Sequence, residues 1–172
     1  MPISAEQPTA KEARMPNYRR NYVPGGSYFF TVNLNDRRQD LLTRHWPLLR
    51  RAIQAVQGCH PFRLDALVVL PDHLHTVWTL PEGDADFSSR WRAVKSRFSK
   101  ALAGDRPIWQ PRFWEHTLKD EGSYRRHLDY VHRNPVKHGW VRRVRDWPYS
   151  TFHRYVEKGV YSLDWMGGAG QG

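Results

Sequence analysis

Two histidines, His73 and His75, are separated by one apolar residue in a stretch rich in β-branched and aromatic side chains. Side chains alternate across a strand, so residues two apart lie on the same face. Two imidazoles on one face can together bind a divalent metal ion. A lone His-x-His pair also suits an ordinary strand, so this pair indicates a metal site only if the chain supplies further ligands.

The segment 121–134 has helical periodicity and carries a second group of candidate residues. Tyr130 and Asn134 are one helical turn apart and share a stripe. A tyrosine hydroxyl, with a reference pKa of about 10, becomes an effective nucleophile when a metal ion polarises the group under attack. An amide oxygen beside two imidazoles would leave the metal its full charge. Asn134 is equally suited to cap the helix end, because Pro135 is expected to stop the helix there.

The charge of the chain is strongly positive and unevenly distributed. The net charge is +10, and 17 of the 27 Lys and Arg residues lie between residues 88 and 158, with only seven of the 17 Asp and Glu. A basic surface of this kind favours a polyanion such as nucleic acid. The candidate DNA contacts are Arg19, Arg20, Arg90, Lys95, Arg97 and Lys137, although a merely solvated face would look the same.

Three absences narrow the class of protein. The single cysteine, Cys59, excludes an internal disulfide framework and a cysteine-rich zinc site. No apolar run approaches the roughly 20 residues that cross a bilayer, and the first residues lack the features of a signal peptide. We therefore expect a protein of the cytoplasm, associated with the nucleoid if DNA is its partner, with no membrane contact.

Hydrophobic periodicity predicts an α+β fold. Strands are expected near 28–34, 62–70, 73–80 and 113–118, and helices near 46–57, 86–102 and 121–134. The order β-α-β-β-α-β is typical of a ferredoxin-like split βαβ fold, with a four-stranded antiparallel sheet and helices on one face. The tyrosine-bearing helix is an addition at the C-terminal side, and the second sheet face is expected to be open for a ligand. Residues 18–158 would form the domain, between a flexible tail (1–17) and a Gly-rich tail (159–172).

Four motifs, in this order, resemble those of the single-tyrosine HUH transposases, and most closely the REP-associated tyrosine transposases. They are Pro24–Leu34 (PGGSYFFTVNL), Leu70–His75 (LPDHLH), Trp109–His116 (WQPRFWEH) and Asp129–Gly139 (DYVHRNPVKHG). The resemblance implies that His73 and His75 are metal ligands and that Tyr130 is the nucleophile. Asn134 falls where the family places a polar third ligand. The resemblance also implies Mg²⁺ or Mn²⁺ as the cofactor, whereas imidazole ligands alone would favour zinc.

The reaction implied by this resemblance is the cleavage and rejoining of single-stranded DNA beside a hairpin. Tyrosine attacks a phosphate, forms a 5′-phosphotyrosine link and frees a 3′-hydroxyl, so no nucleotide cofactor is needed. The partner would be single-stranded or hairpin DNA. The protein would act as a monomer, or as a homodimer that exchanges the tyrosine helix.

Two other functions are compatible with the same pattern. A non-catalytic, sheet-based nucleic-acid binding module shares this topology, but it would present aromatic residues on its central strands. The strand 73–80 presents histidines instead, which favours an enzyme. A domesticated DNA-binding repressor that keeps the site without using it is the other alternative.

Overall fold

The computed structural model describes residues 19–104 and 106–167, so the predicted tail 1–17 and residues 168–172 lie outside it. The elements, in chain order, are β1 (Ser27–Asn33), α1 (Leu41–Arg44), α2 (Trp46–Cys59), β2 (Arg63–Val69), β3 (His73–Thr79), α3 (Phe87–Ala101), β4 (Trp114–Leu118), α4 (Glu121–Lys137), the 3₁₀-helix η2 (Val144–Asp146) and α5 (Phe152–Glu157). The predicted strands and long helices are all present, and the short helix α1 was not expected. None of the helices in the described ranges is long and apolar enough to cross a membrane.

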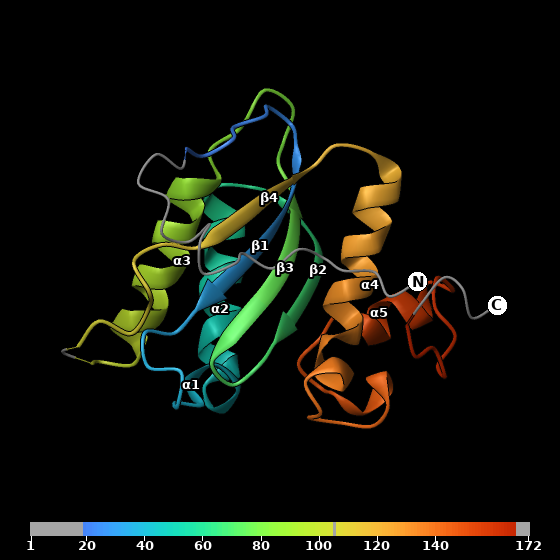
Figure 1. Cartoon of the computed structure of the whole chain (residues 1–172). Coiled ribbons are helices and arrows are strands. Elements are labelled where there is room, and N and C mark those ends of the chain that lie inside the picture. The colour runs from blue at the N-terminus through green and yellow to red at the C-terminus, as the bar shows by residue number, and fades with distance from the viewer. Residues whose placement is uncertain (1–18, 105, 168–172) are drawn as a thin grey trace.

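The four strands form one antiparallel sheet in the order β2-β3-β1-β4 (Figure 1). This order confirms the predicted ferredoxin-like topology. The register places His73 opposite Asn33 and His75 opposite Thr31 on β1, while Val68 of β2 pairs with His75 from the other side. The histidine strand is therefore central, with a hydrogen-bonded neighbour on each side.

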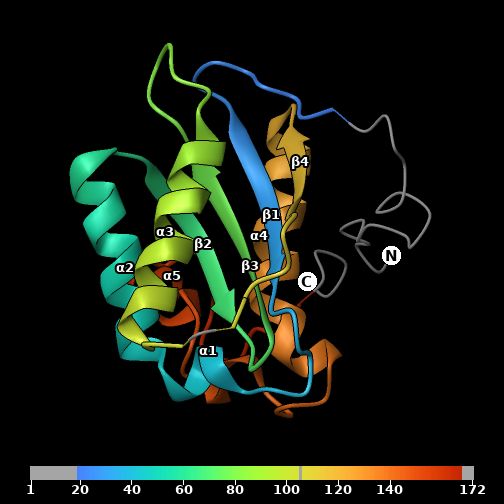
Figure 2. The same ribbon diagram turned by 90° about the vertical axis from the view of Figure 1, so that its left-hand side faces the viewer.

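Helices α2 and α3 cover one face of the sheet, as Figures 1 and 2 show. The apolar stripe of α3 faces inward: Phe87, Trp91 and Phe98 are fully buried, as predicted. Trp91 stacks on Trp78 of β3, with ring centroids 4.2 Å apart. Aromatic burial of this extent supplies much of the driving force for folding, so this layer is the main core that holds the sheet.

The opposite face of the sheet is covered by α4, so the expectation that it would be open was wrong. Leu128 and Val131 of α4 pack on Phe29, Ala66 and Val77 in a second core, which we call the sheet–α4 core. The physical reason is the apolar stripe of the helix, which must be buried somewhere. The sheet face that was expected to be open is therefore an interface between the sheet and α4.

Helix α4 also continues past Pro135, which was predicted to stop it. A proline removes only its own N–H, and hydrogen bonds beyond it maintain the last turn. The amide of His138 donates to the carbonyl of Asn134 at 3.0 Å. Gly139, with φ of +76°, then ends the helix, because only glycine takes this left-handed conformation without strain. Asn134 therefore lies inside the helix.

The chain after α5 packs on the domain instead of forming a tail at residue 159. Tyr161 is buried and contacts Trp165 at a centroid distance of 4.4 Å. Both rings stack on or beside Phe152 of α5. The packed part of the chain therefore extends beyond the boundary predicted at residue 158.

Candidate active site

His73 and His75 begin strand β3, and both are buried. Their rings lie 4.9 Å apart, nearly perpendicular to each other. Phe29 and Tyr130, both members of the sheet–α4 core, contact the ring of His75. The two imidazoles thus share the face that α4 covers, as strand alternation predicts.

Each imidazole is held through its Nδ1 atom. Nδ1 of His75 is 2.8 Å from the hydroxyl of Thr31, and Nδ1 of His73 is 2.8 Å from a carboxylate oxygen of Asp72. A second protein contact of this kind fixes the tautomer and the ring orientation of metal-binding histidines. Nε2 is therefore the atom with which each ring would bind a metal.

Arg37 extends this arrangement outward. Its Nε donates to Asp72, and its terminal nitrogen lies 3.4 Å from Nδ1 of His73. Burial alone would raise the pKa of the Asp72 carboxyl, but hydrogen bonds from His73 and Arg37 outweigh it and hold that pKa below its usual range. The carboxylate therefore stays ionised and keeps His73 oriented.

Burial lowers the pKa of His75 well below its usual value, and the neighbouring His73 and His138 lower it further. Its side chain has no exposed surface. The ring is consequently neutral over the physiological pH range. Neutral imidazole is the form that binds metal ions.

Tyr130 lies against His75 within the same chain. Its ring is 5.4 Å from that of His75 and meets it edge to face. Only 4% of Tyr130 is exposed. The ammonium group of Lys137, two turns further along α4, lies 4.8 Å from the centre of the Tyr130 ring. The predicted nucleophile and the predicted metal ligands are thus brought together by α4.

Asn134 is fully buried, and neither atom of its side-chain amide has a hydrogen-bond partner. It does not cap the helix. Along one stripe of α4, Tyr130 precedes it by one turn and contacts His75, while His138 follows by one turn and lies 5.7 Å from the ring of His73. Asn134 therefore occupies the turn of α4 that lies between the contacts to the two histidines.

These residues fit a divalent metal ion. A buried amide without partners costs about 1–3 kcal/mol per group, and a metal bound to its oxygen would remove part of that cost. Within residues 19–104 and 106–167, no group of three or more His, Cys, Asp or Glu is placed to hold a metal. The buried amide of Asn134 is therefore the candidate for a third ligand beside the two histidines.

No profile of a known protein family matches the chain. A REP-associated tyrosine transposase of Escherichia coli K12 is 57% identical over 153 residues, which cover 89% of this chain and 92% of that protein. The chain belongs to the REP-associated tyrosine transposases. A member from Haemophilus influenzae is 41% identical over 166 residues, covering 89% of this chain and 94% of its own.

A solved structure supports the same assignment. The structure of a REP-associated tyrosine transposase bound to a REP hairpin superposes with a TM-score of 0.87 at 56% identity, covering 90% of this chain and 93% of the other. The chain is therefore an enzyme of the transposase class, with the fold that its sequence predicted.

Several residues that position the site in this transposase were not among the predicted ones. Asp72 directly precedes His73 in sequence, so its role as an acceptor for Nδ1 could have been suspected. Thr31 could not, because its place opposite His75 depends on strand register. Arg37 lies in a turn whose direction the sequence does not reveal.

Substituting Asp72 tests whether this transposase uses it to orient the ring of His73, a predicted metal ligand. We expect Asp72→Asn to weaken Mn²⁺ binding by about 10- to 100-fold, because the loss of a contact to a ligating histidine has that effect on metal sites. Titration calorimetry of the metal into DNA-free protein would measure it. Asp36→Asn is the control, because the Asp36 carboxylate accepts hydrogen bonds from the backbone amide and the guanidinium of Arg38, two residues further along the same turn. Equal affinity in both variants would contradict the role of Asp72.

The six basic residues predicted to contact DNA are not brought together. Arg20 packs its guanidinium 3.9 Å from the centre of the Phe113 ring and donates to the Phe113 carbonyl. Lys95 donates to the carbonyl of Gln110, and burial lowers its pKa to about 8. Arg97 is exposed on α3, on the sheet face opposite the site. Arg19 and Lys137 are exposed, and Lys137 alone of the six contacts Tyr130.

Arg90 is a structural residue of the transposase, and its proposed contact with DNA was wrong. Its guanidinium is buried and donates to the carboxylate of Asp84 at 2.7 and 3.0 Å. It also donates to the carbonyls of His60, Pro61 and Asp86. The hydrogen bonds from Arg90 lower the pKa of Asp84 to about 2. The side chain thus ties the start of α3 to the end of α2 and has no donor directed to solvent.

We expect Arg90→Leu to lower the free energy of unfolding by about 2–4 kcal/mol, because three carbonyls and one carboxylate each lose the hydrogen bonds that Arg90 donates. The affinity for hairpin DNA should not change. Urea unfolding and fluorescence anisotropy would measure the two effects, with Arg92→Leu, on the exposed side of α3, as the control. A stable Arg90→Leu protein with weakened DNA binding would restore the original interpretation.

Proposed function

We propose that this transposase cleaves and rejoins single-stranded DNA next to a REP-type hairpin, with Tyr130 as the nucleophile. The observation that carries the proposal is the contact of Tyr130 with His75, with the unpaired amide of Asn134 one turn away. The hairpin is proposed as the partner because the similar solved transposase is bound to one.

His73, His75 and Asn134 would hold the metal, which we propose to be Mg²⁺ or Mn²⁺. Bound there, it would act as a Lewis acid on an oxygen of the scissile phosphate. The role of the protein residues is to orient the ligands: Thr31 and Asp72 fix the two rings, and the surrounding core keeps the site dry.

In the proposed step the phenolic oxygen of Tyr130 attacks phosphorus, and the bond to the 3′-oxygen breaks. The products are a 5′-phosphotyrosyl strand and a free 3′-hydroxyl, and the phenolic proton balances the one gained by the leaving oxygen. The ammonium of Lys137 would stabilise the negative charge that develops on the phenolic oxygen. Attack by another 3′-hydroxyl reverses the step and joins strands, which conserves the energy of the phosphoester.

One chain supplies all four residues of the proposed site. Tyr130 contacts His75 of its own sheet, so no exchange of α4 between subunits is needed to bring them together. We therefore infer that a monomer is competent for cleavage. The exposed Lys137 and Arg37 flank the site and are proposed to contact the DNA backbone, while Arg19 and Arg97 are proposed only as distant contacts.

The test is to incubate the full chain with a 5′-labelled and a 3′-labelled hairpin strand, with and without Mn²⁺, and to analyse the products on denaturing gels. We expect a metal-dependent covalent adduct that retains the strand on the 3′ side of the break. The other product should end in a free 3′-hydroxyl that a polymerase can extend. Tight hairpin binding with no adduct across a series of hairpins and metals would instead support the DNA-binding repressor.

A further inference from the structure

The segment 147–161, which we call the latch, is added to the edge of strand β2. The amide of Val69 donates to the carbonyl of Tyr149 at 2.8 Å, and the amide of Thr151 donates to the carbonyl of Leu67 at 2.9 Å. The indole of Trp147 donates to the carbonyl of Val69 at 3.0 Å. The latch thus pairs with an edge strand that would otherwise expose its backbone groups.

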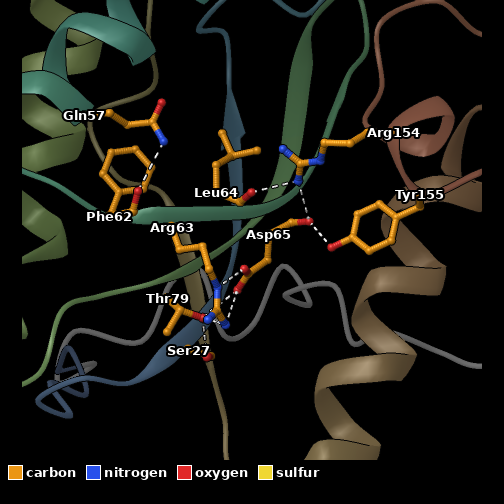
Figure 3. Close-up of polar contacts among 9 residues, drawn as sticks. All are labelled: Ser27, Gln57, Phe62, Arg63, Leu64, Asp65, Thr79, Arg154 and Tyr155. Atoms are coloured by element: carbon orange, nitrogen blue, oxygen red, sulfur yellow. Dashed lines mark hydrogen bonds and ion pairs between the residues drawn. The ribbon is translucent and has the colours of Figure 1, made fainter. Parts of the chain in front are cut away.

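Two further side chains fix the latch to the other end of the same strand (Figure 3). Arg154 donates to the carbonyls of Leu64 and Asp65 at 2.9 and 3.1 Å. The hydroxyl of Tyr155 also donates to the carbonyl of Asp65. Contacts along the length of β2 make the latch a rigid extension of the sheet.

The latch also contacts α4 through a buried series of hydrogen bonds. Nε2 of His132 lies 2.7 Å from the hydroxyl of Thr151, and Nδ1 lies 3.2 Å from the hydroxyl of Tyr161. Tyr161 donates its single proton to Asp129 at 2.7 Å, so it accepts from Nδ1 of His132. His132 is fully buried. Each residue in this series of hydrogen bonds therefore has a defined partner.

These contacts are made on the side of α4 that faces away from the active site. Asp129 directly precedes Tyr130, and His132 follows it by two residues, so helical geometry places them on a different stripe. Thr151 simultaneously bonds to the amide of Leu67 at 3.0 Å. The next residue, Val68, pairs with His75. The latch thus connects the rear of the tyrosine helix to the strand beside the metal ligands.

We propose that the latch positions the nucleophile, with His132 and Tyr161 as its positioning residues. The inference rests on the proposed function. Displacing a reacting group by about 1 Å can cost roughly 100-fold in rate, and the apolar contacts of α4 with the sheet leave its rotation and sliding less defined than hydrogen bonds do. The latch supplies the directional contacts that fix Tyr130 relative to His75.

The test compares Tyr161→Phe with Tyr155→Phe. Each substitution removes one phenolic donor from the latch. Tyr161 donates directly to Asp129 of α4, whereas Tyr155 donates to the Asp65 carbonyl, which keeps Arg154 as a second donor from the latch. Single-turnover cleavage at saturating hairpin DNA is measured together with DNA affinity and thermal midpoint. We expect Tyr161→Phe to slow cleavage by about 10- to 100-fold with DNA affinity unchanged, and Tyr155→Phe to cleave at nearly the wild-type rate.

Thr151 provides a second comparison that does not depend on the tyrosines. Thr151→Ser keeps the hydroxyl and should retain the wild-type rate, whereas Thr151→Val should behave like Tyr161→Phe. Rates are normalised to the folded fraction from circular dichroism, so a folding defect in one variant leaves the other pair decisive. Equal cleavage by Tyr161→Phe and Tyr155→Phe, or a loss that follows DNA affinity, would overturn the inference. An inactive wild type would contradict the proposed function itself.

Discussion

Tyr130→Phe should form no covalent adduct with DNA and should cleave a hairpin strand at least about 10⁴-fold more slowly than the wild type. The substitution removes only the attacking oxygen, and loss of a nucleophile has effects of this size or larger in enzymes with covalent intermediates. The ring keeps its contacts with His75 and Phe29, so hairpin affinity and the thermal midpoint should change little.

The matched control for this variant is Tyr124→Phe. Tyr124 lies on the same helix and also packs against the sheet–α4 core. Burial raises the pKa of its hydroxyl above the usual value, so this hydroxyl is hard to ionise and is a poor nucleophile. Tyr124→Phe should retain both the adduct and the cleavage rate. An adduct that survives Tyr130→Phe but disappears in Tyr124→Phe would show that Tyr124, and not Tyr130, is the nucleophile.

Asn134→Leu should preserve or raise the stability of the metal-free protein while it lowers the cleavage activity. In the metal-free protein the substitution removes two buried amide atoms that have no partner, so the free energy of unfolding should stay equal or rise by about 1–2 kcal/mol. Cleavage should fall by roughly 100-fold or more, because the proposed metal site loses its third ligand. Chemical unfolding with a chelator present and Mn²⁺ titration would measure the two effects.

Asn134→Gln is the conservative partner of this variant, since it keeps an amide oxygen on a longer side chain. It should retain measurable Mn²⁺ binding, while Asn134→Leu should not. If Asn134→Leu destabilised the metal-free protein by several kcal/mol and bound Mn²⁺ normally, the amide would have a structural function and the ligand assignment would fail.

The alternation and periodicity of the sequence were sufficient to predict the sheet and both helices of the main core. Phe87, Trp91 and Phe98 recur at helical spacing, and burial of that stripe left one packing arrangement for α3. Predictions from local sequence signals failed where contacts in the folded protein determined the structure instead. Pro135 was expected to end α4, but hydrogen bonds beyond it and Gly139 moved the end of the helix.

The motifs of the resemblance named residues that the structure places near one another, but they did not name the residues that support them. His73, His75, Tyr130 and Asn134 lie in two motifs, and the structure brings the elements that carry them together. Thr31 was missed because its contact with His75 depends on strand register. Arg90 was misassigned because charge in a sequence does not reveal whether an arginine faces solvent or a set of buried carbonyls.

The central claim, that Tyr130 beside the histidine pair forms the covalent link to DNA, is tested most directly by mapping that link. The adduct formed with a hairpin strand and Mn²⁺ would be digested with a nuclease and trypsin, and the modified peptide sequenced by tandem mass spectrometry. We predict a single nucleotidyl-phosphate on the tyrosine between Asp129 and Val131. A link on any other residue would contradict the assignment.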